Sequence, residues 1–174
     1  TRRKKLCCVD KANVLETSRL WRETVQQMAK EYPEVEVSYE FVDAVAMRLV
    51  QWPNSYDVLI TENLFGDILT DEASVISGSM GLMPSASVGE KTSLYEPIHG
   101  SYPQAAGKDI ANPLATVLSA AMMFEDAFGL VEEAEAIRKV VNKSLDLGIV
   151  TEDLSNQGKP YKTSEVGNWL AANI

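Results

Sequence analysis

The chain has 174 residues, of which 45% are hydrophobic and 24% charged, a composition typical of a folded globular protein with one domain or parts of two. The net charge is −9, and no Lys/Arg cluster is interleaved with aromatic residues, so we expect no nucleic-acid partner. No apolar stretch approaches the roughly 20 residues that a membrane-spanning helix needs, so we expect no membrane partner.

The two cysteines, Cys7 and Cys8, are adjacent in an apolar segment that reads as a strand. Neighbouring side chains of a strand point to opposite faces of the sheet, so this pair is not expected to form a disulfide. Buried thiols and the absence of a recognisable signal peptide indicate a reducing compartment, and we expect a cytoplasmic protein.

Strands and helices alternate in the first part of the chain. The strands are short runs of β-branched, aromatic and apolar residues, and Pro33 and Pro53 follow the first two helices. The predicted elements are a strand at 6–9, a helix at 18–32, a strand at 35–41, a helix at 43–51, a strand at 58–61 and a helix at 65–76. This alternation predicts an α/β fold.

A segment rich in Gly and Ser, 78–89, interrupts the alternation and is the expected boundary between two domains, 1–77 and 78–174. Beyond it we predict a strand near 92–95 and a turn-rich loop at 97–113. The remaining predicted elements are helices near 114–128 and 131–147 and a short helix from residue 164 onwards.

Three aspartates, Asp43, Asp67 and Asp71, are candidate ligands of a hard divalent cation such as Mg²⁺ or Mn²⁺. Asp67 and Asp71 are four residues apart, which places both carboxylates on one face of a helix. Acidic pairs with this spacing are usually a solvated helix face, and Asp43 could simply cap the helix that it opens. Both flanking segments are apolar, which favours carboxylates at the edge of a core and a cation to compensate them.

Several motifs, taken in order, resemble the isocitrate/isopropylmalate family of β-decarboxylating dehydrogenases. They are Val9–Leu15, Val42–Ala44, Thr61–Asp71, Glu96–Ser101 and Ile110–Pro113. The family oxidises a 2-hydroxy acid with NAD(P) and then releases CO₂. Because its members are longer chains, the resemblance implies the C-terminal half of a two-domain fold, with part of a small dimerisation domain followed by part of a cofactor-binding domain.

Two further motifs, Gly81–Gly89 and Ala121–Leu130, are most similar to the isopropylmalate branch of the family. That similarity implies oxidative decarboxylation of 3-isopropylmalate in leucine biosynthesis. Sister enzymes that act on isocitrate, D-malate or tartrate are the nearest alternative. A noncatalytic dimerisation fragment and a simple acidic metal-binding domain are the others.

By resemblance, Asp43, Asp67 and Asp71 bind the metal ion, and Asp43 also contacts substrate. Lys11 is the matching proton-transfer residue at the substrate hydroxyl, where a nearby cation and partial burial favour the neutral amine. Asn13 matches a polar residue beside substrate and nicotinamide. In the family the lysine and the first aspartate reach into the partner's active site, so a homodimer is expected.

The cofactor loop is also assigned by resemblance. No G-x-G-x-x-G motif follows a strand, and the family binds NAD without one. The residues expected to bind the cofactor are Glu96, His99, Gly100, Ser101, Gln104 and Asn112, with His99 against the adenine and Asn112 at its edge. Gln104 departs from the family pattern, because NAD-dependent members usually have an acidic residue there. Glutamine can still bond to ribose hydroxyls, so NAD is the expected cofactor.

Overall fold

The computed structural model describes residues 3–155 and 158–174. The chain divides into two compact units, Thr1–Ile76 and Ser77–Ile174. This division adjoins the boundary expected between residues 77 and 78. The roles expected for the two parts, dimerisation and cofactor binding, stay predictions. Each unit is described by itself.

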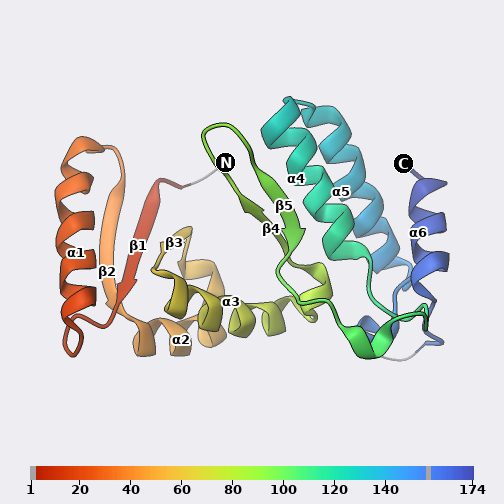
Figure 1. Ribbon diagram of the computed structural model, residues 1–174, viewed down its shortest axis with the longest axis horizontal. Coiled ribbons are helices and arrows are strands. Elements are labelled where there is room, and N and C mark those ends of the chain that lie inside the picture. The colour runs from red at the N-terminus through yellow and green to blue at the C-terminus, as the bar shows by residue number, and fades with distance from the viewer. Residues whose placement is uncertain (1–2, 156–157) are drawn as a thin grey trace. The chain divides into compact units, whose positions relative to one another are not determined.

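The first unit is built on a three-stranded parallel sheet. Its strands are β1 (Lys5–Asp10), β2 (Glu36–Phe41) and β3 (Val58–Ile60), in the order β2-β1-β3 (Figure 1). The central strand is the most deeply buried, with Cys8 and Val9 fully inaccessible to solvent. Parallel strands need crossover connections, and helices make them here, as the alternation in the sequence predicts. Both cysteines are buried free thiols.

Three helices accompany this sheet, namely α1 (Glu16–Met28), α2 (Val42–Gln51) and α3 (Asn63–Ser77). The core of the unit joins strand and helix side chains: Cys7 and Val9 from β1, Val45 and Leu49 from α2, and Leu69 from α3. Val45 and Leu49 are four residues apart, so one apolar stripe of α2 is buried.

Two helix ends differ from the predictions. α1 stops at Met28, and a 3₁₀ helix at Ala29–Glu31 completes the segment predicted as helix up to residue 32. α2 begins at Val42 after Phe41, whose side chain makes no capping hydrogen bond. The capping role considered for Asp43 is therefore wrong, because Asp43 lies within the first turn of α2.

The second unit contains an antiparallel hairpin and three helices. The hairpin strands are β4 (Pro84–Ser87) and β5 (Leu94–Pro97). The helices are α4 (Leu114–Phe128), α5 (Val131–Asp146) and α6 (Thr163–Ala171). α4 packs against the hairpin and lies beside α5 (Figure 1). It ends where Gly129 adopts φ of 67°, a left-handed conformation that favours glycine.

Strand β4 was not predicted, since it lies inside the segment taken as a boundary, and β5 begins two residues later than the predicted 92–95 strand. The main core of the unit is formed by side chains from one side of each of the three helices. It comprises Leu114, Val140, Val141, Val166 and Leu170. Within the described residues, no helix is long and apolar enough to cross a membrane.

Candidate functional site

Lys11 and Asp43 meet where two neighbouring parallel strands end. Asp10, the last residue of β1, is in register with Phe41, the last residue of β2. The residues that follow both strands therefore emerge at the same edge of the sheet, the edge at which open α/β sheets bind ligands. The ammonium nitrogen of Lys11 lies 2.5 Å from Oδ1 of Asp43. The Lys11 side chain is 25% exposed and that of Asp43 is 67% exposed.

Local contacts fix the position of Lys11. Its carbonyl oxygen accepts hydrogen bonds from the backbone N–H groups of Val14 and Leu15, both at 2.9 Å, which close the turn into α1. Its ammonium group lies 5.7 Å from the centre of the Phe41 ring, within the range of a cation–π contact. The Lys11 side chain thus contacts both Phe41, the last residue of β2, and Asp43, in the first turn of α2.

The neighbouring Asp10 is fully buried and is neutralised by Arg22 of α1. The guanidinium group donates to both carboxylate oxygens, at 2.7 Å from Nε and 3.0 Å from Nη2. The backbone N–H of Ala12 donates to Oδ1 at 2.8 Å. The Arg22 guanidinium also lies 5.8 Å from the Tyr39 ring and 5.1 Å from the Phe41 ring. This cluster anchors the turn that carries Lys11.

The contact with Lys11 changes the pKa of Asp43. The hydrogen bond donated by the Lys11 ammonium is the largest influence and lowers the pKa of Asp43, and the backbone of Asp43 lowers the pKa further. Asp43 is consequently ionised at neutral pH, the state that both an ion pair and a metal ligand require.

The three candidate metal ligands do not converge within the described chain. Asp67 and Asp71 both lie on α3, on one helical face as predicted, and both are exposed. Among the described residues, no group of three or more His, Cys, Asp and Glu side chains could hold a metal ion. The structure thus pairs Asp43 with Lys11 and not with the other two aspartates. Asn13, the predicted substrate contact, is exposed in the turn after β1.

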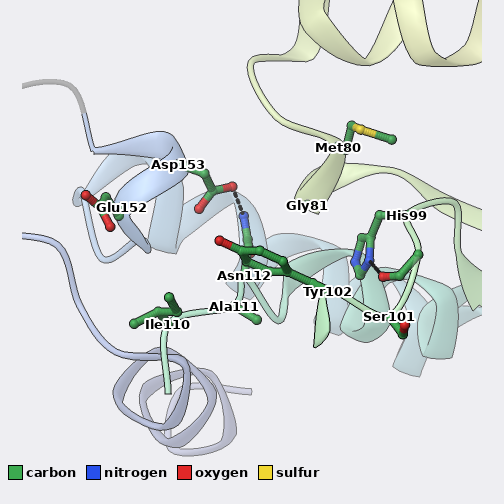
Figure 2. A pocket seen from close by; sticks show the side chains of 11 residues that line it. Met80, Gly81, His99, Ser101, Tyr102, Ile110, Ala111, Asn112, Glu152 and Asp153 are labelled. Atoms are coloured by element: carbon green, nitrogen blue, oxygen red, sulfur yellow. Dashed lines mark hydrogen bonds between the residues drawn. The ribbon is translucent and has the colours of Figure 1, made fainter. Parts of the chain in front are cut away.

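A cavity of about 580 Å³ lies in the second unit. Its wall is formed by the 3₁₀ helix Met80–Leu82, the loop after β5, the segment before α4 and the 3₁₀ helix Glu152–Leu154 (Figure 2). Its volume lies within the range of small-molecule sites. The lining residues are Met80, Gly81, His99, Gly100, Ser101, Tyr102, Ile110, Ala111, Asn112, Glu152 and Asp153.

Four of the six residues predicted to bind the cofactor line this cavity. They are His99, Gly100, Ser101 and Asn112, which come from two segments of the chain. Nδ1 of His99 lies 3.0 Å from the carbonyl oxygen of Gly100. Glu96, in β5, and Gln104, in a 3₁₀ helix at Pro103–Ala105, are both exposed and are not part of the lining. Their cofactor contacts stay predictions.

Asp153 accepts hydrogen bonds from three residues around the cavity, and Figure 2 shows the one from Asn112. Its Oδ2 accepts hydrogen bonds from the hydroxyl of Ser79 and from Nδ2 of Asn112, the latter at 2.9 Å. Its Oδ1 accepts from the hydroxyl of Thr151 at 2.5 Å. Burial alone would raise the pKa of Asp153, but these three hydrogen bonds outweigh it, so the pKa is lowered. Asp153 is therefore an anion that organises the wall.

Asn112 is fixed on both sides of its amide. While Nδ2 donates to Asp153, Oδ1 accepts from the backbone N–H of Leu114 at 2.9 Å, at the start of α4. Gly81 packs directly against it, since a Cβ added there would lie 2.6 Å from Nδ2. Any contact that the Asn112 side chain makes with a ligand must use the remaining N–H or lone pair of the amide.

Sequence reasoning missed several residues of the cavity. Glu152 and Asp153 carried no recognised motif, although Thr151, Glu152 and Asp153 open a turn and are the residue types that make local hydrogen bonds. Tyr102 lies inside the predicted loop 97–113 and Met80 inside the predicted boundary segment 78–89, and neither was singled out there. An aromatic residue next to the predicted His99–Ser101 segment was the one signal that could have found Tyr102.

Known proteins match this chain in sequence over almost its whole length. The model of the isocitrate/isopropylmalate dehydrogenase family matches residues 1–170. The chain is 58% identical over 174 residues to the 3-isopropylmalate dehydrogenase of Bacteroides fragilis, covering 99% of this chain and 49% of that protein. It is 53% identical to the enzyme of the same name from Clostridium acetobutylicum, with the same coverage of the two chains. The chain thus spans about half the length of the curated relatives it matches.

Solved structures agree in fold. The isocitrate dehydrogenase from Methylococcus capsulatus superposes with a TM-score of 0.93 at 38% sequence identity, covering 98% of this chain and 50% of that chain. A β-decarboxylating dehydrogenase from Thermococcus kodakarensis, in its apo form, superposes with a TM-score of 0.83 at 39% identity, covering 97% and 48%.

Proposed function

Because the chain belongs to the isocitrate/isopropylmalate dehydrogenase family, we propose that the protein containing it oxidises 3-isopropylmalate with NAD and decarboxylates the product to 2-oxo-4-methylpentanoate. Curated relatives named 3-isopropylmalate dehydrogenase, 53% and 58% identical, support this substrate. The observation that carries the proposal is the contact between Lys11 and Asp43 at the carboxyl edge of the sheet. It puts a proton carrier and an ionised carboxylate side by side.

In the proposed mechanism Lys11 is the general base that accepts the proton of the substrate hydroxyl. The Lys11 amine would accept that proton as the hydride leaves the same carbon, which gives a ketone, and bound NAD would supply the hydride acceptor. Loss of CO₂ then breaks the carbon–carbon bond, and its electron pair becomes an enolate that takes up a proton. Asp43 holds the ammonium form of Lys11 between these steps, and Asn13 orients substrate from the adjoining turn.

The cavity of the second unit is the proposed site for NAD. The cavity volume of about 580 Å³ suits the adenosine part of the cofactor. Gly81 and Asn112 pack closely against each other at the cavity wall. NAD supplies the hydride acceptor when bound. The described lining residues include no Lys or Arg that could pair with a 2′-phosphate, which supports NAD over NADP. His99 and Asn112 are the proposed adenine contacts.

We also propose a divalent metal ion, whose binding site would need ligands from outside this chain. Asp43, Asp67 and Asp71 supply the right donor chemistry, but within the described residues they form no binding group. By the family resemblance, Asp43 and Lys11 would contribute to the active site of the partner subunit. A homodimer with shared sites is therefore the proposed assembly. Mg²⁺ or Mn²⁺ would stabilise the negative charge that develops on the substrate oxygen.

The experiment follows NADH formation by a full-length protein that carries this sequence, with Mn²⁺, on 3-isopropylmalate, isocitrate, D-malate and tartrate. Preference for 3-isopropylmalate is the expected result. Lys11→Ala should lower kcat by about 10²–10⁴-fold, the usual worth of a general acid–base residue, while the Kd for NAD changes little. A defect confined to NAD affinity would contradict the role of Lys11.

A sister substrate is the second candidate, because the Methylococcus capsulatus structure, an isocitrate dehydrogenase, shares the fold at 38% identity. Preference for isocitrate, D-malate or tartrate in the same assay would select it and leave the Lys11 chemistry in place. The 174-residue chain by itself is expected to form no NADH, and it serves as the control for activity that depends on the remaining half.

A further inference from the structure

Tyr102 is an exposed aromatic residue in the wall of the cavity. Its side chain is among those that line the cavity, and the residue is 54% exposed. Figure 2 shows the ring extending from the loop after β5 toward the part of the wall that carries Asn112. The ring is therefore available to a molecule that enters the cavity.

The backbone of Tyr102 has an unfavourable conformation, with φ of 44° and ψ of 60°. In the described chain only Lys4, Tyr102 and Asp109 are non-glycine residues with positive φ. Aspartate tolerates this left-handed region because its short side chain bonds locally, whereas a bulky aromatic residue does not. Since more than half of Tyr102 is exposed, packing of its ring does not compensate for the strain. Residues held in such conformations cluster at active sites and ligand-binding sites.

The cavity is suited to a flat, uncharged group beside Tyr102. The described lining residues contain no Lys or Arg, and the two carboxylates of Glu152 and Asp153 disfavour an anion. Ile110, Ala111 and Gly81 contribute surface without charge. A purine base meets these conditions, because it is planar and neutral and binds by stacking on aromatic rings.

We propose that the Tyr102 ring stacks on the adenine of NAD and is a specificity-determining residue of the cofactor site. This inference rests on the proposed use of NAD. It assigns base binding to a residue that is absent from the set predicted by resemblance. It also explains how the site can bind adenosine although Gln104 lacks the charge usual at that position.

The test measures binding by calorimetry in a full-length protein that carries this sequence. The probes are ADP-ribose and AMP, which contain adenine, and nicotinamide mononucleotide, which does not. Tyr102→Phe keeps the ring and should bind ADP-ribose within about twofold of the wild type. Tyr102→Leu keeps apolar bulk without a ring, and its Kd for ADP-ribose should rise about tenfold, within the range measured for stacked bases. Nicotinamide mononucleotide binding should not change.

Tyr102→Gly separates ligand binding from fold stability. Glycine adopts positive φ freely, so the variant should melt about 2–4 °C higher than the wild type while it binds ADP-ribose about tenfold more weakly. Two controls match its two effects. Lys4→Gly relieves the same kind of strain in the first unit, where φ is 58°, and Tyr161→Leu removes an exposed ring outside the cavity. Neither control should change ADP-ribose binding.

The outcomes are distinct. Wild-type binding of ADP-ribose with weakened binding by the Leu and Gly variants supports the proposal. Wild-type-like binding by both variants, or a loss confined to nicotinamide mononucleotide, overturns it and leaves the proposed function standing. Failure of the wild type to bind ADP-ribose, AMP or NAD overturns the proposed function as well.

Discussion

Replacement of Asp10 by asparagine is expected to destabilise the first unit strongly. Asp10 is fully buried and accepts two hydrogen bonds from Arg22, whose side chain is 25% exposed. Asparagine keeps an oxygen for Ala12 but presents an NH₂ group to one of the two donating nitrogens of Arg22. It leaves the guanidinium with no countercharge at that position. Breaking a buried ion pair in this way costs about 3–5 kcal/mol.

The lower end of that range is expected, because Arg22 keeps its contacts with the Tyr39 and Phe41 rings. A loss of about 3 kcal/mol corresponds to a fall in Tm of about 6–12 °C for a protein of this size. Urea unfolding followed by circular dichroism measures the change in the free energy of unfolding.

Two comparisons decide whether the buried pair is the cause. Glu16→Gln breaks the exposed pair with Arg19, in which the Glu16 side chain is 82% exposed, and should cost less than about 1 kcal/mol. The double variant Asp10→Ala/Arg22→Met should be less destabilised than the sum of its single variants, because no uncompensated charge remains. Additive effects, or a loss below about 1 kcal/mol in Asp10→Asn, would refute the reasoning.

Three predictions concern the second unit. Gly81→Ala places a Cβ 2.6 Å from the Asn112 amide and should cost about 1–3 kcal/mol in urea unfolding while it weakens ADP-ribose binding; unchanged binding would contradict it. Asp109→Ala removes the hydrogen bonds from the backbone and hydroxyl of Ser164 at the start of α6 and should lower Tm, with Asp109→Asn closer to wild type. Because the folded-state pKa of Asp153 is lowered, its stabilisation is complete above about pH 4 and is lost as the pH falls through that lower pKa. Tm measured from pH 6 to pH 2 should therefore fall less steeply in Asp153→Asn than in the wild type.

The fold of the first unit could be predicted because its signals are local. The apolar run of β1, the alternation of β2 and the prolines after the helices each specify an element within a few residues. The parallel pairing also follows, since helices connect successive strands. Strand β4 could not be predicted in the same way. Its sequence of Pro84, Ser85, Ala86 and Ser87 has little strand propensity, and its pairing with β5 decides its structure.

The candidate site could likewise be predicted from the sequence only in part. The pairing of Lys11 with Asp43 follows from strand register, and the family motifs supplied both residues. Asp153 could not be found locally, because its role depends on Ser79, 74 residues earlier, and on Asn112, 41 residues earlier. Hydrogen bonds between segments so distant in sequence leave no spacing pattern that a single sequence reveals.

Asp43 connects the two expected roles of this part of the chain. Its Oδ1 already accepts a hydrogen bond from the Lys11 ammonium at 2.5 Å, and a cation bound to that oxygen would repel a protonated Lys11. A cation and the Lys11 ammonium would therefore compete for the same carboxylate oxygen. Asp67 and Asp71 lie on another helix and form no binding group with Asp43 in the described residues, so the competition can arise only when further ligands approach. In the proposed homodimer, whose active sites are shared between subunits, the partner subunit would supply these further ligands.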